Sequence, residues 1–194
     1  METIVFVVEV TDDVPWIVIA FALSASLMSV GTVPFSFLSV ASRCLMQSLL
    51  DVRRKPEAML LPSCAMALWT FGNLVRLGLA RSNAVKKREV SLKYYKTYSD
   101  PEGEPLKVGL LAQHVENLFE APPLFHCVSL ALYATRLADT TTVALGWLYF
   151  LFRVIHTYIH TGSNKVSHRF YSYIASTIVL TSLWGVLAAR ILLK

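Results

Sequence analysis

Long apolar blocks alternate with short polar connectors along most of the chain. The blocks cover residues 14–42, 57–80, 108–136, 141–161 and 170–192. A helix needs about 20 consecutive apolar residues to cross the hydrocarbon core of a bilayer, and these blocks are long enough for that. Only 16% of the residues are charged, against about 25% in a typical soluble domain. The pattern predicts an all-α, multi-pass integral membrane protein.

The first block stands apart from the other four. Residues 14–42 contain no charge, and they predict an additional transmembrane helix within an N-terminal extension, residues 1–56. The extension does not resemble a signal peptide, because Glu2 and Glu9 occupy the region where basic residues are needed. Residues 57–194 are predicted to form the main membrane domain.

Two short sequences predict where helices break and begin. Pro122-Pro123 interrupts the block 108–136, and proline is tolerated in a membrane helix when neighbours satisfy the freed carbonyl groups. Asp139 or Thr140 is expected to cap the next helix.

The charge and cysteine content narrow the class of protein further. The net charge is +5, and the basic residues cluster in connectors that adjoin the apolar blocks. Such clusters usually contact anionic lipid headgroups, so no nucleic-acid partner is predicted. The three cysteines lie apart in apolar stretches without a CxxC pair, and we expect them to be small core residues.

The first polar stripe lies within the block 108–136. Gln113, Asn117 and Glu120 follow helical spacing and share one face. Polar and charged groups in an apolar helix are costly, and by default they mark a functional site that faces the interior of a bundle. The alternative is structural, with Glu120 pairing with Arg153 only to hold two helices together.

The second polar stripe runs along the block 141–161 and continues just beyond it. Its members are Arg153, His156, His160 and Asn164, at i, i+3, i+7 and i+11. The arginine fork suits carboxylates, and the histidines can titrate near neutral pH. His156 and His160 also have the i, i+4 spacing of metal ligands.

No metal site is nevertheless predicted for this stripe. The chain has five histidines, fewer than a membrane di-iron site needs, and His114 and His126 are expected at other depths on another helix.

Arginines near the ends of the predicted helices form a third group. Arg76, Arg81 and Arg169 either extend toward lipid phosphates or hold an anionic substrate at the membrane surface. The sequence lacks GxSxG, Walker, HExxH and GxGxxG motifs, which excludes the common soluble hydrolase, nucleotide-binding and zinc-protease classes.

Two stretches together resemble the MAPEG family, the membrane-associated proteins in eicosanoid and glutathione metabolism. Residues 117–125 read NLFEAPPLF and resemble its N-x-x-E-x-x-P signature. From Trp147 to Arg169 the chain is similar to the W-x5-R-x2-H-x3-H-x3-N-x4-R pattern of bacterial members. The resemblance covers about residues 57–194.

The resemblance implies a four-helix membrane bundle that forms a homotrimer and binds glutathione between subunits. It assigns Arg169 to the catalytic role of stabilising the glutathione thiolate, and it puts Glu120 near the amino group of the peptide. The full set implied to contact glutathione comprises Arg76, Gln113, Asn117, Glu120, Arg153, His156, His160, Asn164 and Tyr173.

Two functions follow from this resemblance. The first is a glutathione-dependent transferase or peroxidase that acts on apolar electrophiles or lipid hydroperoxides dissolved in the membrane. The alternative is a non-catalytic protein of the same fold that binds a lipid or another small molecule. The alternative is raised by Gln113, which stands where the family usually has an arginine that contacts glutathione.

Overall fold

The structure, a computed structural model, describes Arg43, residues 56–98 and residues 103–193. The chain falls into two units, Met1–Arg43 and Cys44–Lys194, and the predicted helix at 14–42 lies outside the described residues. The elements of the second unit are η2 (Pro56–Met59), α3 (Leu60–Lys86), α4 (Tyr94–Thr97), α5 (Leu106–Glu120), α6 (Pro122–Ala134), α7 (Thr140–Thr161) and α8 (Val166–Leu192).

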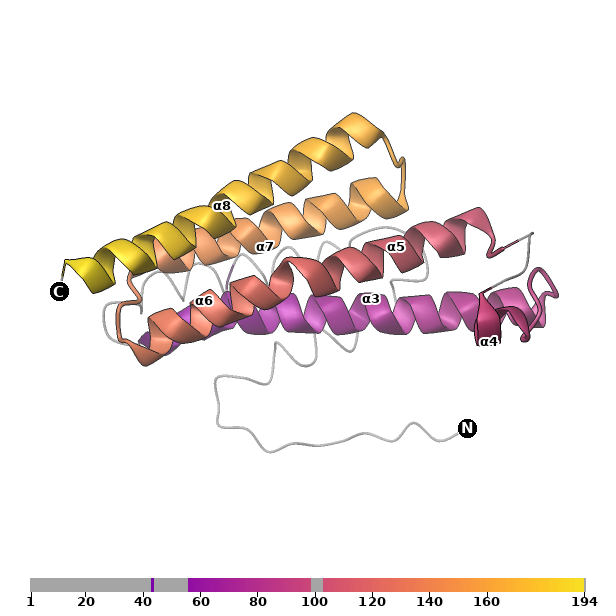
Figure 1. The fold of residues 1–194 in the computed structure, drawn as a ribbon, viewed down its shortest axis with the longest axis horizontal. Helices are drawn as coiled ribbons and strands as arrows, with labels where there is room; N and C mark the ends of the chain where they lie inside the picture. Colours follow the sequence, from indigo (N-terminus) through magenta and orange to yellow (C-terminus); the bar gives the residue numbers. More distant parts are fainter. Residues whose placement is uncertain (1–42, 44–55, 99–102, 194) are drawn as a thin grey trace. The chain divides into compact units, whose positions relative to one another are not determined.

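The long helices of this unit form a four-helix bundle in which α5 and α6 together make one rod (Figure 1). Helix α3 packs against α5, α6 and α7, while α8 packs against α6 and most extensively against α7. The described residues contain no strand. The predicted all-α bundle is therefore confirmed.

The break between α5 and α6 has a direct cause in the sequence. Pro122 and Pro123 have no backbone N–H, so they cannot continue the hydrogen bonding of α5, but they fit the first positions of a new helix. With 15 and 13 residues, the two helices are each shorter than the roughly 30 Å hydrocarbon core. Only the two in succession are long enough to cross it.

The outer surface of the bundle is apolar. Helix α3 with η2, helix α7 and helix α8 are each long and apolar enough to cross a membrane. Phe71 and Leu79 on α3 and Ile178 on α8 are each about 60% exposed. Such side chains suit contact with lipid tails, which solvate apolar groups.

The centre of the bundle contains large aromatic and aliphatic side chains. Phe125 of α6 stacks on Tyr149 of α7 with ring centroids 4.4 Å apart, and both rings are fully buried. Trp69 of α3 meets Phe150 edge to face and donates its Nε1–H to Thr157 at 3.0 Å. These contacts hold α3, α6 and α7 together at mid-height.

Two helices extend beyond the predicted blocks. Helix α3 continues past residue 80 to Lys86, a basic residue in its last turn. Helix α8 begins at Val166, one turn before the predicted start at residue 170. The prediction that the cysteines lie in the core is wrong for Cys64 and Cys127, which are exposed on the apolar outer surface.

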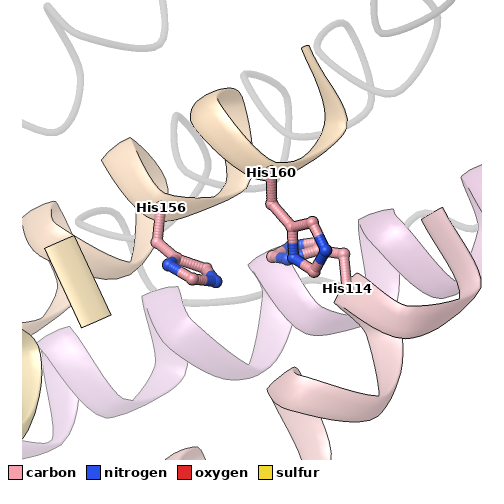
Figure 2. Close-up of side chains that lie close together, drawn as sticks. All are labelled: His114, His156 and His160. Atoms are coloured by element: carbon pink, nitrogen blue, oxygen red, sulfur yellow. The ribbon is translucent and has the colours of Figure 1, made fainter. Parts of the chain in front are cut away.

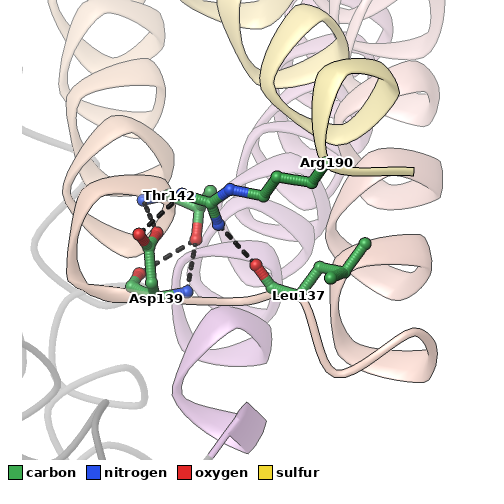
Figure 3. A network of polar contacts seen from close by, with 4 residues as sticks. All are labelled: Leu137, Asp139, Thr142 and Arg190. Atoms are coloured by element: carbon green, nitrogen blue, oxygen red, sulfur yellow. Dashed lines mark hydrogen bonds and ion pairs between the residues drawn. The ribbon is translucent and has the colours of Figure 1, made fainter. Parts of the chain in front are cut away.

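A polar network fixes the end of the bundle where α7 begins (Figure 3). Asp139 caps α7, as predicted: its carboxylate accepts from the Thr142 N–H at 2.9 Å, and Thr142 Oγ1 accepts from the Asp139 N–H at 2.9 Å. Arg190 of α8 donates to the Asp139 carboxylate at 2.6 Å and to the Leu137 carbonyl.

The Asp139 carboxyl group is therefore stabilised in its charged form. Partial burial opposes its ionisation, but hydrogen bonds from Arg190 and Thr142 outweigh this effect and lower the pKa of Asp139 below its usual value.

Candidate functional site

A pocket of about 410 Å³ opens between α5, α7 and α8, close to the turn that joins α7 to α8. Its volume is in the range of small-molecule binding sites. Both polar stripes predicted from the sequence contribute to it. The lining residues are Gln113, Glu116, Asn117 and Glu120 of α5, His156 and His160 of α7, and Val166, Arg169, Phe170 and Tyr173 of α8.

The pocket is open and charged on the α5 side. Gln113, Glu116 and Glu120 are exposed on successive turns of one helix face. Carboxylates are costly against lipid tails. This face therefore requires water, a ligand or another protein surface beside it.

Arg169 lies on the first turn of α8, and the preceding turn holds its side chain. Its Nη1 donates to the Asn164 side-chain carbonyl at 2.9 Å. Asn164 adopts a φ of +46°, a left-handed conformation that asparagine tolerates better than most residues. The Asn164 backbone N–H donates to the Ile159 carbonyl at 2.7 Å. Hydrogen bonds thus fix both the backbone and the side chain of Asn164. Asn164 in turn restrains the Arg169 guanidinium in the pocket lining.

Arg153 lies behind the pocket and is completely buried. Its Nη2 donates to the Asn117 carbonyl at 2.6 Å, in the last turn of α5, where carbonyl groups lack helical partners. Its guanidinium lies 5.7 Å from the ring centre of Tyr173. The other two guanidinium nitrogens, Nε and Nη1, have no hydrogen-bond partner.

The predicted alternative of a Glu120–Arg153 ion pair is not found. Among the described residues, the ion pairs are Arg81–Glu104 at 2.8 Å and Arg190–Asp139 at 2.6 Å. Arg153 joins α7 to α5 through the Asn117 backbone carbonyl instead. Glu120 therefore remains available to a ligand in the pocket.

Three histidines converge beside the pocket (Figure 2). His114 of α5 faces His156 and His160 of α7, with ring centroids 5.5 to 5.9 Å apart. All three side chains are at most 2% exposed. The expectation that His114 lies at another depth is wrong, because the register of α5 against α7 brings it level with His156 and His160.

The histidine rings lack most of the partners that buried nitrogens normally have. Neither ring nitrogen of His114 or His160 has a hydrogen-bond partner, and His156 Nε2 has none. His156 Nδ1 lies 3.2 Å from the Arg169 carbonyl and 3.2 Å from Ser172 Oγ. One nitrogen of His156 is therefore satisfied by α8, and the other faces the cluster.

Three of the arginines singled out from the sequence are not among the lining residues of this pocket: Arg153, which lies behind it, Arg76 and Arg81. Arg76 donates to Thr161 Oγ1 at 3.4 Å, near the end of α7. Arg81 pairs with Glu104 at 2.8 Å and lies over the Tyr95 ring, so it ties the end of α3 to the connector.

Sequence reasoning missed several residues of the site. Glu116 is three residues from Gln113 and four from Glu120, so helical spacing alone could have added it to the stripe. Val166 was predicted to lie in the connector before α8, and Phe170 was predicted as the first residue of that helix but was not assigned to the site. His114 gave no such signal, because it lies on the buried apolar face of α5 with Leu111 and Leu118.

Comparison with known proteins gives one match. A family model described as the MAPEG family matches residues 59–189. No curated protein and no solved structure matches the chain.

Proposed function

Because the chain belongs to the MAPEG family, we propose that its pocket binds glutathione and that the protein is a membrane-bound glutathione-dependent transferase or peroxidase. The observation that carries the proposal is that Arg169 of α8 and Glu120 of α5 line the same 410 Å³ pocket. The α8 lining offers a cation for a thiolate, and the α5 lining offers a carboxylate for an amine.

The charges around the pocket suit the charges of glutathione. The tripeptide carries one ammonium group and two carboxylates. Glu120 is the partner for the ammonium group, because it has no ion pair in the described residues. Arg153 is the candidate partner for a carboxylate: it lies behind the pocket lining, but two of its buried guanidinium nitrogens are unpartnered, and a carboxylate that reached past the lining residues would satisfy them through bidentate contact.

Arg169 is the residue that activates the thiol in this proposal. A free thiol has a pKa of about 8.5, and a nearby guanidinium favours the thiolate. In the transferase reaction, the thiolate sulfur forms a bond to the electrophilic carbon while the leaving group departs with its electron pair. In the peroxidase reaction, two glutathione molecules are oxidised to a disulfide as the hydroperoxide is reduced to an alcohol and water.

The acceptor reaches the sulfur from the apolar side of the pocket. Phe170 and Val166 are exposed on the first turn of α8 beside Arg169. They are the apolar lining residues through which a lipid hydroperoxide or an apolar electrophile dissolved in the bilayer approaches.

The proposal includes a homotrimer in which a neighbouring subunit closes the open side of each pocket. It is supported by the exposed polar side chains of Gln113, Glu116 and Glu120 on one face of α5. A second subunit would cover these polar groups and remove them from lipid.

The test is to measure glutathione binding, thiolate absorbance and conjugation of an activated aryl chloride by the purified full chain. Arg169→Ala is expected to lower kcat/KM by about 100-fold or more, the usual effect of removing one group that stabilises developing charge. Lys165→Ala removes a neighbouring exposed cation that does not line the pocket and should stay close to wild type. Absence of glutathione binding, or wild-type activity in Arg169→Ala, would overturn the proposal.

The alternative, a non-catalytic lipid-binding or small-molecule-binding protein, has one observation in its favour. Gln113 is a neutral side chain of the pocket lining at the position where the family usually has a cation, so one charge for holding glutathione is absent. A binder of this kind would retain a lipid through purification and would form no thiolate when mixed with glutathione.

A further inference from the structure

We propose that His114, His156 and His160 form a binding site for one divalent transition metal ion of the zinc class. One ligand nitrogen of each ring can be chosen so that all three lie within 4.8 Å of one another. The three rings come from two helices, α5 and α7, and point toward a common centre (Figure 2).

The unpartnered nitrogens are the first argument for a metal. Five of the six ring nitrogens in the cluster have no hydrogen-bond partner, although the side chains are at most 2% exposed. A neutral imidazole has one N–H donor and one lone pair, and burying both without partners is costly. A single metal ion would satisfy one lone pair on each ring at the same time.

The spacing of the rings is the second argument. His156 and His160 are at i and i+4 on α7, which puts two imidazoles on one face one turn apart. Nitrogens bound to tetrahedral zinc at about 2.1 Å lie about 3.4 Å apart. The nitrogens of the cluster lie within 4.8 Å of one another, so metal binding requires them to move closer together by at most about 1.4 Å.

The partners of His156 are the third argument. Its Nδ1 lies 3.2 Å from the Arg169 carbonyl, an oxygen that can only accept, so this contact is a hydrogen bond when Nδ1 carries the proton. The Ser172 hydroxyl at 3.2 Å also donates to the Arg169 carbonyl, which favours the same tautomer. The lone pair is then on Nε2, the nitrogen that has no partner and faces the cluster. A backbone carbonyl that fixes the tautomer in this way is the usual support of a metal-bound histidine.

The chemistry of the cluster selects the class of metal. Three neutral imidazoles suit Zn²⁺, Co²⁺, Ni²⁺ or Cu²⁺, whereas Mg²⁺ and Ca²⁺ prefer oxygen ligands. Neutral ligands leave the metal charge uncompensated, and Arg153 and Arg169 are nearby cations. An anionic fourth ligand, such as hydroxide, would offset part of this positive charge, and the pocket lined by His156 and His160 would give it access.

The metal site shares His156 and His160 with the pocket of the proposed glutathione reaction, but the two proposals assign their chemistry to different groups. Metal binding requires the imidazoles of His114, His156 and His160, whereas thiolate formation was assigned to Arg169. The sequence alone did not predict a metal site, because it did not bring His114 to the same level as the other two rings.

The test is a titration of the chelator-treated full chain with Co²⁺ in the absence of glutathione. The wild type should bind one equivalent per chain and develop the intense visible absorption of four-coordinate cobalt. His114→Leu should lower cobalt affinity by at least about 10-fold, the lower end of effects reported for disturbing a metal site. The matched control is His168→Ala, which removes an exposed histidine of α8 and should bind cobalt as the wild type does.

A second measurement keeps the proposal testable if His114→Leu does not fold. X-ray absorption of the zinc-loaded wild type should show three imidazole ligands. Fewer than three imidazoles, unchanged cobalt binding by a folded His114→Leu, or no binding by the wild type would overturn the metal site. Glutathione thiolate absorbance, measured on the same metal-free protein, tests the proposed function separately.

Discussion

Asn164 accepts a hydrogen bond from Arg169 Nη1 at 2.9 Å across the turn that joins α7 to α8. Asn164 was predicted to contact glutathione, but it is not among the residues that line the pocket. Its position indicates a different role, because it orients the guanidinium of Arg169, the group that is proposed to stabilise the thiolate. Asn164 is thus a positioning residue for Arg169.

Asn164→Gly should impair the activation of glutathione with little effect on folding. Glycine accepts the φ of +46° without strain, so the variant removes the side-chain hydrogen bond alone. A less restrained Arg169 should raise the midpoint of thiolate formation and lower kcat/KM by about 10-fold, or about 1.4 kcal/mol. The measurement is thiolate absorbance against pH. An unchanged midpoint would show that the hydrogen bond does not position the guanidinium.

Arg153→Met should weaken glutathione binding while the protein remains folded. Arg153 is fully buried with two unpartnered nitrogens, and methionine fills a similar volume without a buried charge, although it leaves the Asn117 carbonyl without its Arg153 donor. Loss of its contact with a carboxylate should raise the glutathione Kd by about 10- to 100-fold, since a hydrogen bond to a charged group contributes about 1.5–3 kcal/mol.

The control for Arg153→Met is Arg76→Met, measured by the same glutathione titration. Arg76 donates to Thr161 and has no glutathione contact in the proposed assignment, so the glutathione Kd of this variant should change by less than about twofold. A large effect at Arg76 and none at Arg153 would reverse the assignment of the carboxylate partner.

Features that depend on one segment of chain were predictable from the sequence. Pro122 and Pro123 lack N–H groups wherever they occur, so the break in the third block could be located to the residue. Asp139 could be predicted as a cap because capping depends on residues within one turn. Helical spacing likewise placed Gln113 and Glu120 on one face.

Features that depend on two helices were not predictable in this way. The depth of His114 relative to His160 is set by the register of α5 against α7. The spacing of residues within either helix does not determine this register. The same holds for Arg153, which bonds the Asn117 carbonyl of α5 rather than the nearby carboxylate of Glu120. Spacing identifies the face of a helix, whereas packing between side chains determines which residues meet across it.

Gly146→Ala should destabilise the bundle because α7 approaches η2 and α3 closely at this residue. A Cβ at Gly146 would lie 3.0 Å from Pro62 Cγ and 3.3 Å from Met59 Cε. The proline ring cannot rotate away, so the free energy of unfolding should fall by about 1–3 kcal/mol. Thermal unfolding in detergent, followed by circular dichroism, measures this change.

The matched substitution for Gly146→Ala is Gly185→Ala, on the exposed side of α8. A Cβ at Gly185 meets no atom within 4 Å. Alanine favours the helix over glycine by up to about 1 kcal/mol, so this variant should unfold at the same temperature as the wild type or higher. Equal destabilisation by both substitutions would contradict a role for close packing at Gly146.

The ion pair between Asp139 and Arg190 predicts a loss of stability in acid. The folded-state pKa of Asp139 is lower than its unfolded-state value, so its contribution is fully present above the unfolded pKa of about 3.9 and is lost as the pH falls through the folded pKa. The carboxylate is 44% exposed, and after allowance for solvent screening the contribution is about 1 kcal/mol or less.

Asp139→Asn keeps an oxygen that can cap α7 but cannot form the ion pair. Above pH 5 it should therefore unfold at a slightly lower temperature than the wild type, and below pH 3 the difference should shrink. A difference that stays constant over this range would mean that the cap, and not the charge, stabilises the end of the bundle.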